Sequence, residues 1–181
     1  MKKNKLLVTG VAGYIGSTFA YEALKKGYEV IGVDNFCNSD DAIVAYFLKN
    51  HPDQFEFIEL DLQNQTGLNS ILRQHKNIDC VLHFAALKSV SESEEKFDLY
   101  WKNNVEGTKS LLKVMEVNKI KNIIFSSSAA IYGEQAIQPI TEEAEKKPVS
   151  TYASTKLASE KYIKKYALNK VINAISLRYF N

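Results

Sequence analysis

The sequence has few of the residues that build metal sites. Its 181 residues include two cysteines, Cys37 and Cys80, and three histidines, His51, His75 and His83. These residues are scattered and follow neither a CxxC spacing nor another metal-ligand spacing, so we expect no metal site. For His83, which falls in an apolar run, we expect a strand residue packed in a core.

Long apolar runs and clustered charges are also absent. Near the amino terminus only Leu6-Leu7-Val8 precede Thr9-Gly10, which is too short for a signal peptide or a membrane span. The 23 basic residues are mixed with 21 acidic ones, and the net charge is +2. A nucleic-acid-binding protein would need a clustered basic stripe. We therefore expect a cytoplasmic globular protein that binds neither nucleic acid nor membranes.

What the sequence does have is a regular alternation of short β-branched runs with longer amphipathic segments. We expect six strands, at Lys5–Thr9, Glu29–Val33, Phe55–Leu60, Asp79–Phe84, Asn122–Ser127 and Val171–Arg178. We expect helices near Tyr14–Lys26, Asp40–Asn50, Gly67–Gln74, Glu92–Asn118 and Thr151–Leu168. Strands that are apolar almost throughout are typical of a sheet covered on both faces. The alternation predicts an α/β fold with a doubly wound, Rossmann-like parallel sheet and right-handed crossovers.

The chain ends at Arg178-Tyr179-Phe180-Asn181, directly after the sixth predicted strand. Ligands of open α/β sheets bind beyond the carboxyl ends of the strands. We therefore interpret residues 1–181 as one nucleotide-binding domain, and we expect a small carboxyl-terminal substrate domain to be missing.

A glycine-rich turn joins the first predicted strand to the first predicted helix. Gly10, Gly13 and Gly16 have the spacing GxxGxxG. The first glycine permits a tight turn, the second lets backbone amides approach a pyrophosphate, and the third lets the helix pack closely on the strand. The helix amino terminus adds free N–H donors and the positive end of a dipole. The position of this turn predicts a dinucleotide site.

Asp34 follows the second predicted strand, close to the distance of about 20 residues that such sites show. Its carboxylate can accept hydrogen bonds from the adenosine ribose and would repel a 2′-phosphate, so NAD is favoured over NADP. The alternative interpretation is an aspartate that caps a turn, which Asn35 could also do. Asp61 and Leu62 close the third strand in the same way and would flank the adenine.

The spacing YxxxK, which places both side chains on one face of a helix, occurs three times. The pairs are Tyr21/Lys25, Tyr152/Lys156 and Tyr166/Lys170. Only Tyr152/Lys156 opens a helix that follows a strand ending in Ser126-Ser127-Ser128. This serine run could be a polar strand exit, but it falls at the edge where ligand chemistry is expected.

These residues suit the oxidation of a sugar alcohol. A phenol has a pKa of about 10, and a nearby cation lowers it by about 1–3 units. Lys156 alone would leave Tyr152 mostly protonated at neutral pH, so the positive charge of an oxidised nicotinamide would help. Tyr152 would take the hydroxyl proton while hydride passes from the same carbon to the nicotinamide. Ser128 would hydrogen-bond the reacting oxygen and relay the proton.

With these motifs, the chain resembles the UDP-glucose 4-epimerases of the extended short-chain dehydrogenase/reductase superfamily, over essentially its whole length. The resemblance rests on Val8-Thr9-Gly10, Gly13-Tyr14-Ile15-Gly16-Ser17, Val33-Asp34-Asn35, Cys37-Asn38-Ser39, His83-Phe84-Ala85-Ala86-Leu87-Lys88, Asn103-Asn104-Val105, Phe125-Ser126-Ser127-Ser128, Ile131-Tyr132-Gly133, Tyr152 with Lys156, and Leu177-Arg178-Tyr179-Phe180-Asn181.

The resemblance implies that NAD stays bound while UDP-galactose and UDP-glucose are interconverted. Hydride leaves C4 of the hexose, the 4-keto sugar rotates, and hydride returns to its other face. The resemblance and the motifs together assign NAD contacts to Gly10, Gly13, Tyr14, Ile15, Gly16, Asp34, Asn35, Phe36, Cys37, Asn38, Ser39, Asp61, Leu62, Phe84, Ala85, Ala86, Leu87, Lys88, Asn103, Ser128, Tyr152, Lys156 and Phe180. The UDP-sugar would face Ser128, Tyr152 and Asn181. The resemblance also implies a homodimer, built through the helices expected at Glu92–Asn118 and Thr151–Leu168.

The chain departs from these epimerases at Ala130, where they usually have threonine, and at Ser91, where glycine is common. Sugar-nucleotide 4,6-dehydratases need an acidic pair at the positions of Ala129-Ala130, and the related decarboxylases need a glutamate at the second one. Both activities are therefore disfavoured. An epimerase of a UDP-N-acetylhexosamine or a UDP-uronate stays open, as does a catalytically inactive NAD-binding fragment. A dedicated redox sensor is disfavoured by the presence of Ser128, Tyr152 and Lys156 together.

Overall fold

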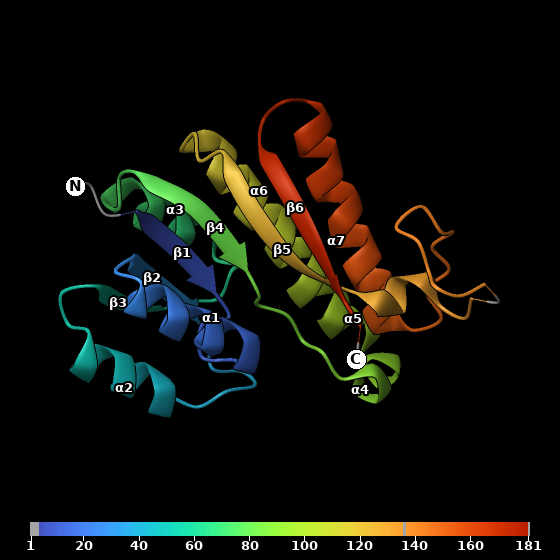
Figure 1. Cartoon of the computed structure of the whole chain (residues 1–181), viewed down its shortest axis with the longest axis horizontal. Coiled ribbons are helices and arrows are strands. Elements are labelled where there is room, and N and C mark those ends of the chain that lie inside the picture. The colour runs from blue at the N-terminus through green and yellow to red at the C-terminus, as the bar shows by residue number, and fades with distance from the viewer. Residues whose placement is uncertain (1–3, 136, 181) are drawn as a thin grey trace.

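The computed structural model describes residues 4–135 and 137–180, which form a six-stranded, all-parallel sheet in the order β3-β2-β1-β4-β5-β6 (Figure 1). The strands are β1 Lys5–Thr9, β2 Glu29–Asp34, β3 Phe55–Glu59, β4 Ile78–His83, β5 Asn122–Ser128 and β6 Asn173–Tyr179. The strand order reverses between β1 and β4, which is the switch point at which doubly wound sheets bind their ligands. The predicted fold class is confirmed.

Helices cover both faces of the sheet. They are α1 Tyr14–Lys25, α2 Ala42–Asn50, α3 Gln65–Gln74, α4 Val90–Glu95, α5 Phe97–Tyr100, the π-helical turn η1 Trp101–Glu106, α6 Gly107–Val117, the 3₁₀ turn η2 Ala129–Tyr132 and α7 Thr151–Leu168. One core forms where α3, α6 and α7 pack on the sheet, and a second forms under α1 and α2. Leu7 faces the first core while Leu6 and Val8 face the second, which is why the strand is apolar at successive positions.

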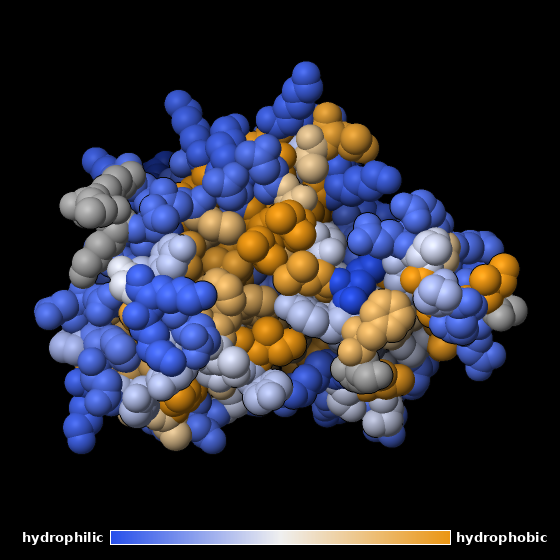
Figure 2. Space-filling view, in the orientation of Figure 1, coloured by the Kyte–Doolittle hydropathy of each residue, from blue (hydrophilic) through white to orange (hydrophobic). Residues whose placement is uncertain are grey.

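The edge strand β6 is covered on one face only. Its residues alternate between half-buried and exposed positions, and Ile175, Leu177 and Tyr179 are exposed. Figure 2 shows the apolar surface that gathers over β5 and β6 on this side of the molecule. Within the part of the chain that the structure describes, β6 pairs with β5 alone. Among the described helices, none combines the length and the apolar character that crossing a membrane requires.

The single helix predicted over Glu92–Asn118 is wrong, because this region is divided. The backbone leaves the helical conformation at Lys96, with φ −122° and ψ 49°, between α4 and α5. A contact across the break holds the two helices together: the Glu92 carboxylate accepts a hydrogen bond from Tyr100 Oη at 2.8 Å, and it also accepts one from Lys96 Nζ at 2.9 Å. Ser89 caps α4 by accepting a hydrogen bond from the Glu92 amide. These side chains fold a compact corner that a hydrophobic periodicity does not reveal.

Smaller differences lie at the ends of elements. Helix α3 starts at Gln65, two residues before its predicted start, because Asn64 caps it by accepting a hydrogen bond from the Gly67 amide at 2.9 Å. Strand β6 starts at Asn173 rather than at Val171. Neither difference moves a predicted site residue away from the carboxyl edge of the sheet.

Helix α1 packs closely against the glycine turn at Gly16. A Cβ atom there would lie 2.0 Å from the carbonyl oxygen of Gly10, so any side chain forces α1 away from the turn. We expect Gly16→Ala to lower the free energy of unfolding by about 2 kcal/mol, measured by urea denaturation. Gly107→Ala is the matched control, because its Cβ would meet only Leu62 Cβ at 3.5 Å. Equal stability of the two variants would contradict this account of α1 packing.

Candidate active site

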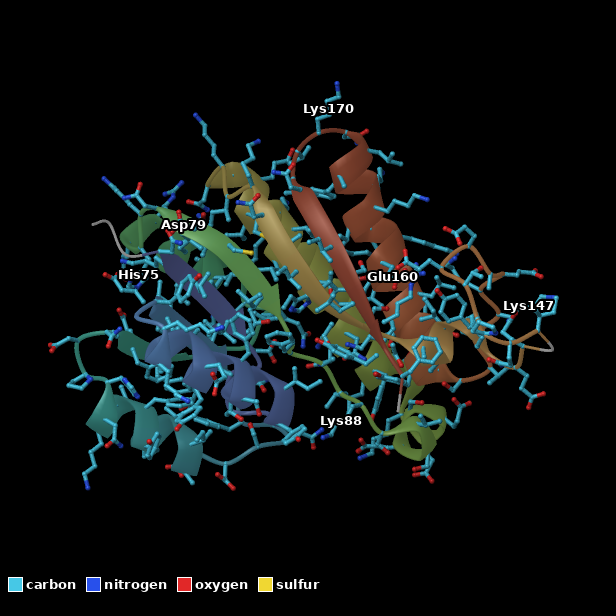
Figure 3. The ribbon with its side chains drawn as sticks, in the orientation of Figure 1. His75, Asp79, Lys88, Lys147, Glu160 and Lys170 are labelled. Atoms are coloured by element: carbon cyan, nitrogen blue, oxygen red, sulfur yellow. The ribbon has the colours of Figure 1, made fainter. Side chains whose placement is uncertain are left out.

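A cleft of about 420 Å³ opens along the carboxyl ends of the strands. It is lined by Gly10, Gly13, Tyr14, Ile15, Gly16, Val33, Asp34, Asn35, Cys37, Asn38, Ser39, Leu60, Asp61, Leu62, Phe84, Ala85, Ala86, Lys88, Val90, Asn103, Ser126, Ser127, Ser128, Ala130, Tyr152, Lys156 and Tyr179. Figure 3 shows Lys88 at this end of the sheet, whereas His75, Asp79 and Lys170 lie toward the opposite end. The fold thus brings residues from positions 10 to 179 around one cavity.

The glycine turn forms the floor of one end of the cleft. Gly10 has φ +72°, and a Cβ there would lie 2.5 Å from the Ala85 amide nitrogen, so only glycine fits. Gly13 is the residue before α1, and within this described helix no side chain caps the amino terminus and the first turn has no acidic residue. Tyr14, Ile15 and Gly16 therefore bring backbone donors and the positive end of the helix dipole to the cleft. This cradle fits the diphosphate of a dinucleotide.

Asp34 caps a turn, as the alternative interpretation expected, and its carboxylate also lines the cleft. Its Oδ2 accepts a hydrogen bond from the Ala12 amide at 3.0 Å, and its Oδ1 accepts from the Phe36 amide at 3.0 Å and from Ser39 Oγ at 3.2 Å. The carboxylate thereby joins the glycine turn to the loop after β2. It also lines the cleft, where a carboxylate can accept further hydrogen bonds from a ribose. Asp61 lies beside it and accepts from Asn35 Nδ2 at 3.2 Å.

A buried chain of hydrogen bonds runs from the floor of the cleft into the core. Thr108 Oγ1 donates to the Asn104 carbonyl at 2.6 Å, so it accepts from His83 Nε2 at 2.9 Å. His83 Nδ1 is then an acceptor for Thr9 Oγ1 at 2.8 Å, and Thr9 Oγ1 in turn accepts from the Ala85 amide at 3.4 Å. This directionality requires a neutral imidazole with its proton on Nε2. Burial, reinforced by the charge of Lys156, lowers the pKa of His83 to about 3.

Asn104 extends this chain to the helix that carries the tyrosine. Its Oδ1 accepts from the Leu87 amide at 2.8 Å, while its Nδ2 donates to the Leu87 carbonyl at 3.0 Å and to Thr155 Oγ1 at 3.1 Å. Ser159 Oγ donates to the Asn104 carbonyl at 3.1 Å. Asn104 lies in the π-helical turn, a distortion that is frequent at functional sites. The segment after β4 and helix α7 are therefore joined through one amide side chain.

Tyr152 lies in the first turn of α7, which is fixed at its start by three hydrogen bonds. Ser150 Oγ accepts from the Ala153 amide at 3.1 Å, the Tyr152 amide donates to Ser93 Oγ at 3.0 Å, and the Thr151 amide donates to Glu94 Oε1 at 2.6 Å. The corner formed by α4 thus holds the amino terminus of α7 and the backbone of the tyrosine.

Lys156 lies one turn further along α7 and is buried. Its Nζ donates to the Ser126 carbonyl at 2.9 Å and lies 5.9 Å from the centre of the Tyr152 ring. Among the described residues, the pairs Tyr21/Lys25 and Tyr166/Lys170 do not line the cleft. Tyr152/Lys156, the pair that its position in the sequence favoured, is therefore the one of the three YxxxK pairs that lines the cleft.

The protein itself leaves the tyrosine protonated at neutral pH. Burial raises the pKa of Tyr152, and the Ser128 side chain opposes this by hydrogen bonding. Burial also lowers the pKa of Lys156 to about 8, so the ammonium form still dominates at pH 7. The charge of Lys156 is thus retained in the core, but the phenol needs further positive charge to ionise readily.

The comparisons with known proteins agree with this geometry. The model of the NAD dependent epimerase/dehydratase family matches residues 6–181. The chain belongs to this family. It is 44% identical over 138 residues to a UDP-glucose 4-epimerase of Klebsiella pneumoniae, covering 76% of this chain and 99% of that relative. It is 40% identical over 181 residues to a UDP-glucose 4-epimerase of Schizosaccharomyces pombe, covering 97% of this chain and 51% of that relative.

Solved structures of UDP-glucose 4-epimerases share the fold of this chain. The crystal structure of the UDP-glucose-4-epimerase from Stenotrophomonas maltophila, with bound NAD and formylated UDP-arabinopyranose, has a TM-score of 0.92 at 36% identity and covers 99% of this chain and 53% of that one. The enzyme from Bifidobacterium longum, in complex with NAD⁺ and UDP, has a TM-score of 0.92 at 37% identity, covering 98% and 53%. The chain thus spans about half the length of most of the epimerases it matches, and the expected NAD dependence agrees with the description of its family.

Three of the predicted NAD-binding residues lie outside the wall of the cleft. Phe36 packs against Phe57 with ring centres 5.1 Å apart, Leu87 is buried, and Phe180 is exposed and stacks on Tyr132. Asn181, predicted to face the UDP-sugar, lies outside the described residues.

The wall of the cleft also contains residues that were not predicted to bind NAD or the sugar, namely Val33, Leu60, Val90, Ser126, Ser127, Ala130 and Tyr179. Most of them are next to a predicted site residue in the sequence, and this proximity is the feature that could have indicated them. Among the described residues, no group of three or more potential metal ligands occurs.

The buried, neutral His83 predicts how stability depends on pH. Its pKa of about 3 lies below the value of about 6.5 in an unfolded chain, so the unfolded state binds the extra proton between these values. This residue therefore lowers the free energy of unfolding by about 1.4 kcal/mol for each pH unit as the pH falls from 6.5 toward 3. Urea denaturation of the wild type and His83→Asn at several pH values would measure this. We expect the variant to be less stable at pH 7 and the difference to shrink at pH 5; a constant difference would contradict the neutral assignment.

Proposed function

We propose that this chain is the NAD-binding half of a UDP-sugar 4-epimerase that interconverts UDP-galactose and UDP-glucose. The observation that supports this best is the convergence of Ser128, Tyr152 and Lys156 on the cleft that the glycine turn and Asp34 also line. A base for a sugar hydroxyl and a cradle for a dinucleotide therefore share one cavity. Relatives described as UDP-glucose 4-epimerases support the choice of substrate.

In the proposed reaction Tyr152 is the group that holds and moves the proton. When bound, oxidised NAD supplies a hydride acceptor and an additional positive charge. The Tyr152 Oη accepts the proton of the sugar hydroxyl, and Ser128 hydrogen-bonds the same oxygen and orients it. Lys156 is fixed by the Ser126 carbonyl and keeps its charge close to the phenol ring. Epimerisation leaves the sugar at its original oxidation level, so Tyr152 returns the proton at the end of each cycle.

Asp34 supports NAD over NADP as the cofactor. Its carboxylate lines the cleft and already accepts three hydrogen bonds, which hold it in place. A 2′-phosphate at the ribose would bring another negative charge beside it, and like charges at close range repel.

A second candidate is the epimerisation of a UDP-N-acetylhexosamine or a UDP-uronate. The UDP-N-acetylglucosamine 4-epimerase of Methanobrevibacter ruminantium, with a TM-score of 0.87 at 34% identity, supports this alternative. The dehydratase and decarboxylase reactions need an acidic residue after the active-site hydroxyl, and Ala130 occupies the cleft wall there.

We also propose that the protein is cytoplasmic and forms a homodimer through the region from α4 to α6 together with α7. Phe97 and Leu99 of α5 are about half exposed, and Phe97 stacks on Trp101 with ring centres 5.6 Å apart. An apolar surface of this kind suits burial against a second copy.

Replacing the tyrosine tests the proposed mechanism. We expect Tyr152→Phe to bind NAD with an affinity within about threefold of the wild type and to lose about 10²–10⁴-fold in turnover, because the fold is kept but the base is gone. Conversion of UDP-galactose to UDP-glucose would be followed with the chain alone and with the chain joined to the carboxyl-terminal half of a relative. Tyr166→Phe is the control with the same YxxxK spacing. Unchanged turnover in Tyr152→Phe would remove this residue from the mechanism, and no interconversion of any UDP-hexose by the joined chain would refute the assignment.

Replacing Asp34 tests the choice of cofactor. Asp34→Asn keeps a hydrogen-bond acceptor in the turn but removes the charge. We expect the preference for NAD over NADP, measured as a ratio of dissociation constants by calorimetry, to fall about tenfold or more, because roughly 1.4 kcal/mol of repulsion corresponds to a factor of ten. Asp53→Asn is the control, because Asp53 precedes β3 and so lies at the amino-terminal ends of the strands, away from the cleft. An unchanged ratio in Asp34→Asn would show that another group selects the cofactor.

A further inference from the structure

The segment between η2 and α7 connects the two residues that the proposed reaction places on the sugar oxygen. It follows Ser128 and η2, and it ends where α7 begins, just before Tyr152. In its described part, residues 133–135 and 137–150, it contains neither helix nor strand. Loops of this length without secondary structure are uncommon in compact domains and are usually functional. Whatever fixes this loop also contributes to fixing Ser128 relative to Tyr152.

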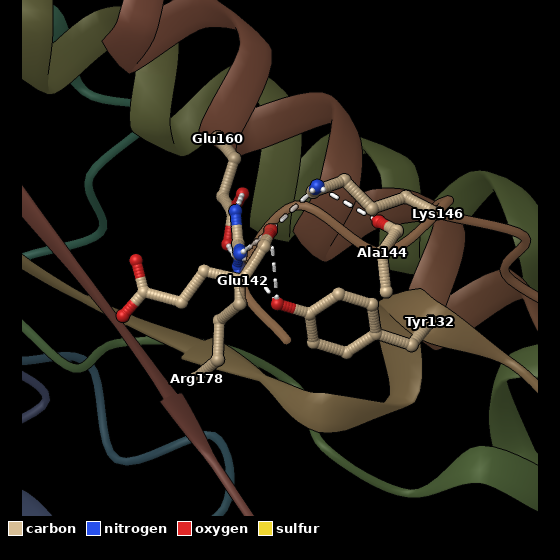
Figure 4. A network of polar contacts seen from close by, with 6 residues as sticks. All are labelled: Tyr132, Glu142, Ala144, Lys146, Glu160 and Arg178. Atoms are coloured by element: carbon tan, nitrogen blue, oxygen red, sulfur yellow. Dashed lines mark hydrogen bonds and ion pairs between the residues drawn. The ribbon is translucent and has the colours of Figure 1, made fainter. Parts of the chain in front are cut away.

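The loop is held by Arg178, which reaches it from the carboxyl end of β6 (Figure 4). Arg178 Nη1 donates to Tyr132 Oη at 2.6 Å and to the carbonyl oxygen of Glu142 at 3.1 Å. The same carbonyl accepts a hydrogen bond from Lys146 Nζ at 3.1 Å and one from Tyr132 Oη at 3.4 Å. One backbone oxygen of the loop therefore collects three donors, two of which are cationic.

The other side of the same guanidinium binds α7. Arg178 Nε donates to Glu160 Oε1 at 3.0 Å, and Nη2 donates to Glu160 Oε2 at 2.9 Å, which is a bidentate ion pair. Glu160 is 8% exposed, so its charge depends on this partner. Hydrogen bonding to Glu160 raises the pKa of Arg178 further above its ordinary range. Because Glu160 follows Lys156 by four residues, it lies on the face of α7 that also carries Lys156.

The cluster also reaches the end of β6. Tyr179, the next residue along the chain, lines the cleft, and the Phe180 ring stacks on Tyr132 with ring centres 6.3 Å apart. Arg178, Glu160 and Tyr132 themselves are absent from the described wall of the cleft. They act behind it, where α7, the loop and β6 meet.

We propose that Arg178 and Glu160 are positioning residues, which hold the described part of the loop (residues 133–135 and 137–150) and the end of β6 against α7 and so fix Ser128 beside Tyr152. The roles of Ser128 and Tyr152 rest on the proposed function. The anchoring itself depends only on the fold and can be tested without substrate.

The first measurement is tryptic cleavage of the 181-residue chain after Lys146, whose side chain is tied to Glu142 and Ala144 in the loop. We expect Arg178→Met to accelerate this cleavage at least tenfold, while sites in the sheet and in α1 stay within twofold of the wild type. Arg178→Lys should give a smaller increase, because one ammonium group cannot bind Glu160 in a fork and also reach Tyr132 and Glu142. Tyr132→Phe keeps the ion pair between Arg178 and Glu160 but removes the hydrogen bond from Arg178 to Tyr132, so it should also accelerate cleavage in the loop. It replaces Arg178→Met in this test if that variant does not fold.

The second measurement is the ¹⁹F spectrum of the chain labelled with 3-fluorotyrosine, in which the Tyr152 signal is identified by its loss in Tyr152→Phe. A change in overall stability alone leaves the shift of this signal in the folded state unaltered, whereas a displaced Ser128 changes the surroundings of the phenol. We expect the Tyr152 signal to move or broaden in Arg178→Met and in Glu160→Gln, with the Tyr21 signal unchanged. Glu106→Gln, which removes a surface ion pair with Lys109, is the control and should alter neither measurement.

A Tyr152 signal that is unchanged in Arg178→Met would overturn the proposal, even if the loop is cleaved faster. Cleavage that accelerates equally across the whole chain would overturn it too, because Arg178 would then support general stability. An absence of epimerase activity bears on the proposed function and leaves both of these measurements interpretable.

Discussion

The structure of the cleft depends on one buried chain of hydrogen bonds. In this chain the neutral imidazole of His83 accepts a hydrogen bond from Thr9 and donates one to Thr108. Thr9 lies at the end of β1, His83 at the end of β4, and Thr108 in α6. A hydrogen bond made in the core is strong when every member is satisfied, and each missing partner leaves a buried polar group at considerable cost. Through the Asn104 carbonyl and side chain this chain continues to α7. The glycine-turn side and the tyrosine side of the cleft are thereby connected through hydrogen bonds.

The same chain explains how a buried lysine is tolerated. Lys156 is 3% exposed and has one carbonyl partner. A protonated His83 nearby would place two positive charges in the core, and the directions of its hydrogen bonds prevent this. Among the described core residues, the cation close to Tyr152 is therefore Lys156, and its ammonium group donates to the Ser126 carbonyl. The Arg178–Glu160 pair, by contrast, is a neutral unit, so it can tie three segments together without altering the charge near the phenol.

Much of the fold follows from the sequence, because a two-faced parallel sheet imposes a simple pattern on it. Continuous apolar strands predicted the sheet and its strands, and the glycine turn at Gly10 and Asp34 were predicted at the carboxyl ends of the strands, where both line the cleft. The break at Lys96 could not be predicted in this way, because it is accompanied by contacts of Glu92 with Tyr100 and of Ser93 with the backbone of Tyr152. Asn104 and Arg178 were missed as anchors for the same reason. Their partners, at Leu87, Thr155 and Glu160, become neighbours only when the chain is folded.

The open side of β6 has a consequence for how this chain behaves in solution. Its backbone N–H and C=O groups on the side away from β5 have no strand beside them within the described residues, and Ile175 and Leu177 add apolar surface next to that row. Unpaired strand edges are templates for further strands, and native proteins usually cover or blunt them. An open edge of this kind can accept a further strand from another polypeptide and so extend the sheet. The sheet therefore ends or continues at β6 according to what packs against this edge strand.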